Sequence, residues 1–406
     1  MTPNIPRSLT PRPSPVPPPA LTPGLSLTPG LSVTPGLFLT GLLLLAGAAM
    51  LALAAAPPAQ AATRAPVLKD YIVTGAKPDR LFVIDAAERR IRSEFVIPGA
   101  NDFVATIVPS PNGRVAYVLV NKMESIAGID LDTGKQVFRA DLSSPGERVK
   151  CLFSFDVTPD GRELIVYELP VKLGLSEDHV EETRFAVFRT DAGLGAKPVR
   201  QFPAPRRVHT LLSRKDGKSF FAVGFELYEF DVQTGRQLAE QGIRNWTYTN
   251  HTIPDVLAFW PVSEPTGVFS TPVYSSVPPA AGQTDPVPKT ALMTLDLTSG
   301  ELQYHDFEDT AALIFSMVLS PTRTEAYGVY SQLTKVDTRT NTLTKRVDLD
   351  HTYYAVLVST DGSEVYAAGA MCDVTVFDSV TLDKKANIKL TGCGDQSITS
   401  PRVIRR

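Results

Sequence analysis

The chain contains five histidines, and no two of them have the spacing of a metal-ligand pair. They are His179, His209, His251, His305 and His351. Because a structural or catalytic zinc site needs several converging donors, isolated histidines of this kind are typical of surface or hydrogen-bonded structural positions. The sequence therefore predicts no metal centre.

The other common catalytic patterns are also missing from the sequence. There is no Gly-x-Ser-x-Gly, no Gly-x-Gly-x-x-Gly, no P-loop, no Cys-x-x-Cys and no haem attachment motif Cys-x-x-Cys-His. Adjacent acids such as Glu181 and Glu182 indicate a solvated loop. We therefore expect no catalytic residue, no cofactor and no metal on this chain, and the fold must explain its function.

Residues 351–390 show the unit from which the chain is built. Four short apolar runs, near Tyr353–Ser359, Glu364–Ala368, Val374–Phe377 and Lys385–Leu390, are separated by turn residues. Asp361-Gly362 supplies the positive φ angles of a tight hairpin. Four antiparallel strands in about 40 residues are typical of one blade of a β-propeller.

The third strand of each blade ends in an apolar pair followed by an acidic turn, and this ending recurs seven times. It is found at Asp85, Asp130, Asp191 in a degenerate form, Asp231, Asp296, Asp337 and Asp378. An aspartate in such a turn can accept hydrogen bonds from backbone amides two residues on. First-to-second-strand hairpins number only six. The N-terminal blade begins with its second strand, at Lys69–Thr74, so Ser397–Ile404 is predicted to return as its first strand. The sequence thus predicts an all-β, seven-bladed propeller closed by a C-terminal strand in the N-terminal blade, which leaves no open sheet edge around the ring.

Three connections are longer than the repeat requires. Leu169–Thr183 and Pro272–Lys289 separate second from third strands, and Gln241–Ile253 precedes the fifth blade. Second-to-third turns and links between blades emerge on one face of a propeller, so all three insertions are predicted on that face. Elaborated loops on a rigid scaffold usually mark the binding side. Residues there form the candidate partner interface: Trp246, Tyr248, His251, Tyr274, His351 and Tyr354.

Two of these assignments have alternatives. Trp246 and Tyr248 are either a contact patch or a loop anchor, because aromatic side chains serve both purposes. Of Tyr353 and Tyr354, which start an innermost strand, one is predicted to face the neighbouring blade as core. The other is predicted to reach the end of the central channel.

Three cysteines are present, and two of them could form a disulfide. Cys372 lies in the second-to-third turn of the last blade, and Cys393 lies in the link to the closing strand. Both connections leave on the same face, so a bridge is geometrically possible if the Cα atoms come within about 7 Å. Pairing and three free thiols both remain open from the sequence. Cys151 is expected to be free and buried.

The first 61 residues differ from the rest. They hold 13 of the 34 prolines, two arginines and no acidic residue, and they include the uncharged apolar run Leu37–Ala56 before Ala59-Gln60-Ala61. This pattern predicts a proline-rich leader with a secretory signal peptide, cleaved after Ala61, and a mature propeller domain of residues 62–406 in the periplasm. A retained signal anchor is the alternative, since about 20 apolar residues can span a bilayer. All 43 acidic residues lie in the mature part, against 38 basic ones, which argues against a nucleic-acid surface.

Several stretches go beyond a general propeller pattern, and together they resemble the β subunit of quinohaemoprotein amine dehydrogenase. The resemblance covers roughly residues 67–406. Its stretches are Asn121–Ser125, Gly128–Lys135, Glu147–Phe153, Thr158–Gly161, Tyr167–Val171, Pro254–Trp260, Thr266–Tyr274 and Asp350–Gly362. The long leader and the pair Cys372 and Cys393 depart from that family.

The resemblance implies a periplasmic heterotrimer that oxidises primary amines. Its α subunit would be a dihaem cytochrome c, and its small γ subunit would carry cysteine tryptophylquinone. The β subunit would be a non-catalytic, seven-bladed propeller with YVTN-type repeats, which helps to wall the substrate cavity. No membrane contact is expected after signal cleavage. The alternatives are a free-standing secreted propeller, either a lactonase-like enzyme or a binding or surface protein. A lactonase should place convergent acids, histidine or arginine at the channel mouth, and the sequence shows no such cluster.

Overall fold

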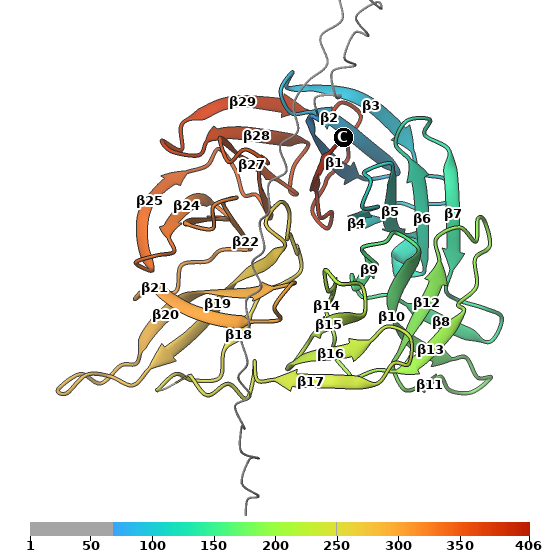
Figure 1. Cartoon of the computed structure of the whole chain (residues 1–406), viewed down its shortest axis with the longest axis horizontal. Helices are drawn as coiled ribbons and strands as arrows, with labels where there is room; N and C mark the ends of the chain where they lie inside the picture. Colours follow the sequence, from blue (N-terminus) through green and yellow to red (C-terminus); the bar gives the residue numbers. More distant parts are fainter. Residues whose placement is uncertain (1–67, 249) are drawn as a thin grey trace, which may run out of the picture. The chain divides into compact units, whose positions relative to one another are not determined.

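A computed structural model describes residues 68–248 and 250–406. In this part the chain forms seven antiparallel sheets arranged in a ring, each with the four strands of a propeller blade (Figure 1). The predicted seven-bladed all-β fold is confirmed. The predicted leader and cleavage site lie outside the described residues. Within those residues, no helix combines the length and apolar character needed to cross a membrane.

The strands run from the innermost to the outermost position of each blade. Blade 1 consists of β30 (Arg402–Arg405), β1 (Asp70–Ala76), β2 (Arg80–Asp85) and β3 (Arg90–Val96); blade 2 of β4 (Val104–Pro109), β5 (Val115–Val120), β6 (Ser125–Asp130) and β7 (Gln136–Asp141); blade 3 of β9 (Phe155–Val157), β10 (Glu163–Lys172), β12 (Arg184–Arg189) and β13 (Arg200–Pro203); blade 4 of β14 (Thr210–Ser213), β15 (Ser219–Val223), β16 (Leu227–Asp231) and β17 (Gln237–Gln241). Blade 5 consists of β18 (Asp255–Val256), β19 (Val268–Val277), β20 (Val287–Asp296) and β21 (Leu302–Glu308); blade 6 of β22 (Ser316–Leu319), β23 (Glu325–Val329), β24 (Gln332–Asp337) and β25 (Thr342–Asp348); blade 7 of β26 (Ala355–Val358), β27 (Glu364–Ala368), β28 (Asp373–Asp378) and β29 (Lys384–Lys389). Two short strands, β8 (Glu147–Lys150) and β11 (His179–Val180), pair with β10, and a 3₁₀ turn, η1 (Asn121–Met123), joins β5 to β6.

The closing strand is where the repeat count requires it. β30 pairs antiparallel with β1, so that Tyr71 lies opposite Ile404 and Val73 opposite Arg402. One strand from the C-terminus thus completes a sheet whose other three strands come from the N-terminal end of the propeller. The predicted range Ser397–Ile404 is wider than the observed strand, because Gln396 and its neighbours form a turn before β30 begins.

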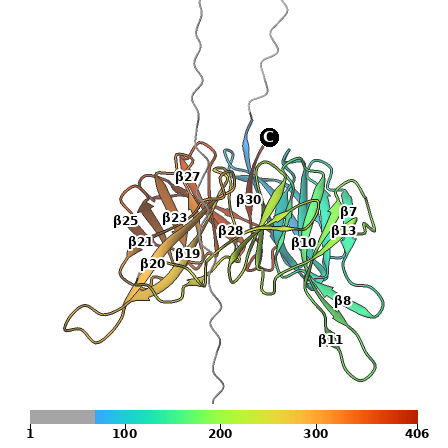
Figure 2. The same ribbon diagram turned by 60° about the horizontal axis from the view of Figure 1, so that its bottom comes forward.

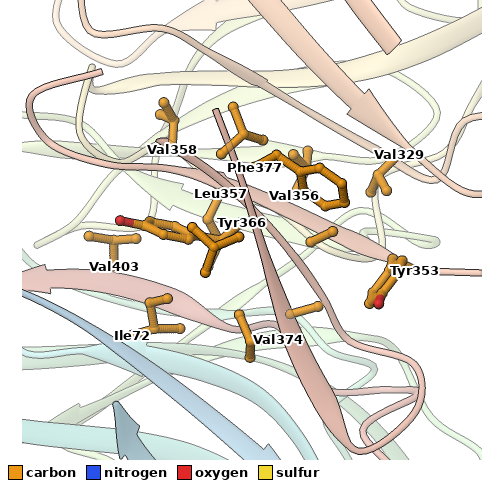
Figure 3. Packing of buried hydrophobic residues seen from close by; sticks show 14 of the residues in the cluster. Ile72, Val329, Tyr353, Val356, Leu357, Val358, Tyr366, Val374, Phe377 and Val403 are labelled. Carbon is orange, nitrogen blue, oxygen red and sulfur yellow. The ribbon is translucent and has the colours of Figure 1, made fainter. Parts of the chain in front are cut away.

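The core lies between blades rather than within one sheet. Inner strands such as β1 and β2 are buried along nearly their whole length, whereas the outermost β3 alternates between half-buried and exposed residues. Figure 3 shows the largest cluster, in which Ile72 and Val403 of blade 1 pack with Tyr366 and Val374 of blade 7. Burying each such aliphatic side chain stabilises the fold by about 1.5–3 kcal/mol. The ring therefore closes through apolar contacts as well as through β30.

The acidic turns form as predicted in five third-to-fourth-strand hairpins. The carboxylates of Asp130, Asp231, Asp296, Asp337 and Asp378 each accept backbone N–H bonds from the residues two and three positions on. Gly134 then follows at φ +71°, where a Cβ atom would lie 2.4 Å from the Phe95 ring of blade 1. The turn therefore requires glycine for both its backbone angle and its contact with the preceding blade.

The predicted insertions Leu169–Thr183 and Pro272–Lys289 each begin as a continuation of a blade strand and then turn back through a loop. β10 continues to Lys172 and pairs there with β8 and β11, and β19 pairs with β20 as far as Val277 opposite Val287. Pro288 does not interrupt β20, because this part of the strand has a neighbour on one side only and no second ladder to break. Figure 2 shows the β19–β20 tip and β11 projecting from the same side of the ring.

Candidate functional site

The second-to-third turns and the links between blades make up one face of the ring, which we call the link face. The opposite face, with the first-to-second and third-to-fourth turns, is the turn face. Nine of the 17 exposed large apolar side chains lie in connections of the link face. They are Leu152, Leu173, Leu175, Val180, Phe225, Tyr248, Ile253, Leu313 and Met371. Phe259, also exposed, follows β18, and its ring contacts Phe153 and His209, which lie in two of the links. Exposed apolar side chains on one face offer contact area to a protein partner.

Three of the predicted interface residues come together in the link before blade 5. The Trp246 ring lies 5.3 Å from Tyr248 and 5.6 Å from His251, and Tyr248 lies 4.4 Å from His251. Trp246 Nε1 donates to the carbonyl of Thr252, while His251 Nε2 lies 2.8 Å from the Asp306 carboxylate. Trp246 thus anchors the link, and Tyr248, 37% exposed, is the member of the group that a partner can reach.

Tyr274 and His351 lie apart from that group and hold other connections. The Tyr274 hydroxyl lies 2.7 Å from both the N and the O atom of Ile314, and burial raises the pKa of Tyr274 to about 12. His351 Nε2 lies 3.1 Å from the buried carboxylate of Asp373, which also accepts from Asn387 and Lys389. Burial acts to raise the pKa of Asp373, but these hydrogen bonds outweigh it and the pKa is lowered. Both residues therefore fix the geometry of the link face.

Next to Asp373 the structure pairs Cys372 with Cys393 in a disulfide, with Cα atoms 5.6 Å apart. The bridge ties the second-to-third turn of blade 7 to the segment before β30. Cys151 is buried and free, and burial raises the pKa of its thiol far above the usual value. A thiol in that state is a poor nucleophile.

Tyr354 belongs to a second aromatic group, at the link-face end of the innermost strands. Its ring lies 5.3 Å from Trp260 and 4.9 Å from Phe315, and Phe315 stacks on Tyr330 at 4.2 Å. Phe259, 41% exposed, continues the row next to Trp260. Tyr353 is buried in the core instead, as expected for one of the two adjacent tyrosines.

The sequence analysis missed Trp260, Phe315 and Tyr330, although a signal was available. In five blades an aromatic ring precedes the innermost strand by one or two residues: Phe103, Phe153, His209, Phe315 and Tyr354. A residue at that position must point across the end of the channel or into the neighbouring blade. Aligning the blades on their innermost strands would have revealed the row.

The central channel holds a charged group that the sequence analysis did not foresee. Arg402 of β30, with 8% of its side chain exposed, donates to both carboxylate oxygens of Glu264 at 2.6 and 3.1 Å. Asp156 of blade 3 also lines this cavity of about 390 Å³ and accepts a hydrogen bond from the backbone of Ser213. The sequence shows no such cluster, because these residues are far apart in sequence and only ring closure brings them together.

The ionisation of the channel acids differs. Burial raises the pKa of Asp156. Burial also acts to raise the pKa of Glu264, but the charge and hydrogen bonds of Arg402 outweigh it, so that the pKa is lowered. Arg402 is already saturated by Glu264 and by the carbonyls of Ile107 and Pro261. In the part of the chain that the structure describes, no group of three or more His, Cys, Asp or Glu residues could hold a metal ion.

No family model and no curated protein matches the sequence. Solved structures resemble the fold. The hydrazine synthase of Kuenenia stuttgartiensis is similar with a TM-score of 0.51 and 14% identity, over 75% of this chain and 90% of that one. A protein of unknown function from Desulfotomaculum acetoxidans is similar with a TM-score of 0.53 and 12% identity, over 82% of this chain and 98% of that one. At such identity the similarity supports the propeller fold alone.

Proposed function

We propose that this chain is the non-catalytic propeller subunit of a periplasmic quinohaemoprotein amine dehydrogenase. In this proposal the link face docks the small subunit that bears cysteine tryptophylquinone, and a dihaem cytochrome c subunit receives the electrons. The oxidised substrate is a primary amine, held in a cavity that the propeller helps to enclose. The resemblance of residues 67–406 to that β subunit suggests this role.

The observation that carries the proposal is the uneven distribution of exposed apolar side chains. They gather on the link face, where two extended hairpins and the Tyr248 and Phe259 rings offer contact area. Aromatic side chains at the centre of a desolvated patch contribute most to protein association. The likeness to hydrazine synthase is a likeness of fold and does not select the substrate.

The channel acids favour a second candidate, a free-standing enzyme of the lactonase type. Asp156 and Glu264 line one cavity, as a hydrolase would require. However, Glu264 and Arg402 satisfy each other, and Asp156, the other acid among the described residues that line this cavity, already accepts a hydrogen bond from Ser213. The channel residues therefore support the hypothesis of a lactonase-type enzyme less well than the link face supports the hypothesis of a docking subunit.

Co-expression with the proteins encoded beside its gene tests the proposal. Alone, the propeller should fold, show no visible absorbance and reduce no dye in the presence of a primary amine. Together, the subunits should co-purify and gain both the haem spectrum and amine-dependent dye reduction. Amine oxidation by the isolated chain would contradict the proposal, and hydrolysis of a lactone by the isolated chain would favour the second candidate.

A further inference from the structure

Phe225 is an exposed ring between two arginines on the link face. It lies in the turn from β15 to β16 of blade 4 and is 39% exposed. The Cζ atom of Arg207 lies 4.6 Å from the ring centre, and that of Arg244 lies 5.0 Å from it. Arg207 comes from the link that enters blade 4, and Arg244 comes from the link that leaves it. The two charges are therefore within about 10 Å of each other, a distance at which salt screens them only in part.

Neither guanidinium has an acidic partner among residues 68–248 and 250–406. Arg206, the neighbour of Arg207 in the sequence, does have an acidic partner, because it pairs with Glu182 at 3.1 Å. Two arginines that share one ring and lack carboxylates repel each other, and stacking on the ring offsets part of this repulsion. Stacking also leaves the edge N–H donors of a guanidinium free for a planar, bidentate anion.

The arginines border a small cavity of about 240 Å³ between blade 4 and the link to blade 5. His209 lines its wall, and burial lowers the pKa of His209 to about 4, so that the imidazole is neutral near pH 7. Among the described residues of the lining, Asp255 is the one acid. The buried carboxylate of Glu226, next to Phe225, accepts hydrogen bonds from the backbone of Ile243 and Asn245, so that the two arginines carry the charge that faces outward.

We infer that Arg207, Phe225 and Arg244 form a clamp for a carboxylate side chain of the docked partner subunit. This inference rests on the proposed function in so far as that function assigns the link face to docking. Bidentate hydrogen bonds from arginine to a carboxylate are among the stronger polar contacts in proteins, and they fix orientation as well as adding affinity. The clamp thus sets the register of the partner on a face that is otherwise mainly apolar.

The surroundings favour a protein carboxylate over the other sources of anion. Two exposed apolar residues lie farther along the chain, Ile253 in the link to blade 5 and Phe259 just after β18, so that an anion arriving here arrives together with apolar surface. An anionic membrane is disfavoured, because the β10–β11 hairpin places Glu177, Asp178, Glu181 and Glu182 on the same face. A free small carboxylate would lack the apolar contacts.

The test in the complex compares R207Q/R244Q with R236Q as a matched control. Arg236 is exposed in the third-to-fourth turn of the same blade and so lies on the turn face. The double variant should raise the dissociation constant of the co-expressed complex about ten-fold and weaken its dependence on salt, because two charge-assisted contacts are lost. The R236Q control should change the dissociation constant less than about two-fold. Equal affinity and equal salt dependence of R207Q/R244Q and wild type would overturn the clamp.

A second test needs no partner subunit and separates failure of the clamp from failure of the proposed function. The isolated propeller is titrated with an acetylated and amidated peptide, Gly-Trp-Glu-Asp-Gly, and with its Gln-Asn counterpart, while NMR follows the arginine side chains. Wild type should bind the acidic peptide more tightly, and R207Q/R244Q should lose that preference while melting at the wild-type temperature. This outcome supports the clamp even if no amine dehydrogenase assembles. Equal binding of both peptides, binding of sodium acetate as tight as that of the acidic peptide, or Arg207-dependent binding to phosphatidylglycerol vesicles would overturn it.

Discussion

Arg402 is a buried cation that joins parts of the ring far apart in sequence. Its strand belongs to blade 1, its carboxylate partner Glu264 belongs to blade 5, and it also donates to the carbonyl of Ile107 in blade 2. Such a pair contributes little net stability compared with apolar residues of the same size, but removing one partner leaves the other buried without compensation. The channel charges therefore act as a cross-link in the closed ring.

We expect Glu264→Gln to lower the free energy of unfolding by about 3 kcal/mol, because the Arg402 guanidinium stays buried without its carboxylate. Urea denaturation at neutral pH measures this loss. The double variant Arg402→Met/Glu264→Leu is the control and should lose much less, since neither charge remains. If Glu264→Gln unfolds at the same urea concentration as wild type, the pair does not brace the ring.

The turn aspartates predict how stability depends on pH. Backbone hydrogen bonds from Thr234 lower the pKa of Asp231, and Arg339 lowers the pKa of Asp337 to about 2 from its ordinary value of 3.8. The unfolded chain thus binds more protons than the folded chain between these values. Stability from these turns is complete above about pH 4 and should be lost as the pH falls toward 2. Thermal melting at steps between these pH values measures the loss. Asp231→Asn should make this loss smaller, and an unchanged profile would show that the turn does not stabilise the folded state through its charge.

The residues that could be predicted from the sequence are those whose partners are near in the chain. Asp130 bonds to amides two and three residues away, so its role follows from the local pattern. Glu264 and Arg402 are 138 residues apart, and no local pattern links them. Arg207 and Arg244 could not be paired from the sequence for the same reason, because they meet only through the ring of Phe225, which lies in a third segment.

At the scale of elements, strand order was predictable because each blade repeats the same apolar runs and turns. The sequence shows only six first-to-second-strand hairpins for seven blades, and the prediction that β30 completes blade 1 followed from this difference. Strand length was less predictable. The prolines of this segment suggested a loop, but at Pro288 the hairpin extends past β21, where a missing N–H breaks no second ladder.

The disulfide between Cys372 and Cys393 lies between blade 7 and the closing strand. The bridge joins two residues 21 positions apart in sequence. Closing a loop of that size stabilises the folded state by about 3 kcal/mol, because the bridge restricts the unfolded chain. Thiol counting on denatured, unreduced protein should therefore find one free thiol, Cys151. Cys393→Ser should lower the melting temperature, whereas Cys151→Ser should leave the bridge between Cys372 and Cys393 intact. Three reactive thiols in the unreduced wild-type protein would contradict the pairing.

At the scale of the whole molecule, the two faces of the ring differ in kind. The turn face repeats short acidic turns whose side chains bond their own backbone, which leaves little for a partner to recognise. The link face carries the long hairpins, the Tyr248 and Phe259 rings and the cavity that Arg207, Phe225 and Arg244 border. Because the innermost strands fix every link to one rigid ring, a partner bound across blades 3 to 5 would contact a preformed surface with a low ordering cost.

The extended β19–β20 hairpin is the element whose role is tested most cleanly at this scale. Residues 275–277 and 287–289 pair with each other beyond the ladder with β21, and Ser276 also hydrogen-bonds Thr252 of the link before blade 5, so replacing only 278–286 by a two-residue Asn-Gly turn should leave the blade and this link intact. We expect the shortened protein to melt within a few degrees of wild type but to retain less of the co-expressed subunits, with a dissociation constant raised about ten-fold. Shortening the β10–β11 hairpin in the same way is the matched comparison, because it removes an acidic extension from the same face. If neither deletion weakens assembly, the partner does not dock on the link face. If only the β10–β11 deletion does, the contact lies over blade 3. Loss of thermal stability without loss of the partner would show that the β19–β20 extension serves the blade rather than the complex.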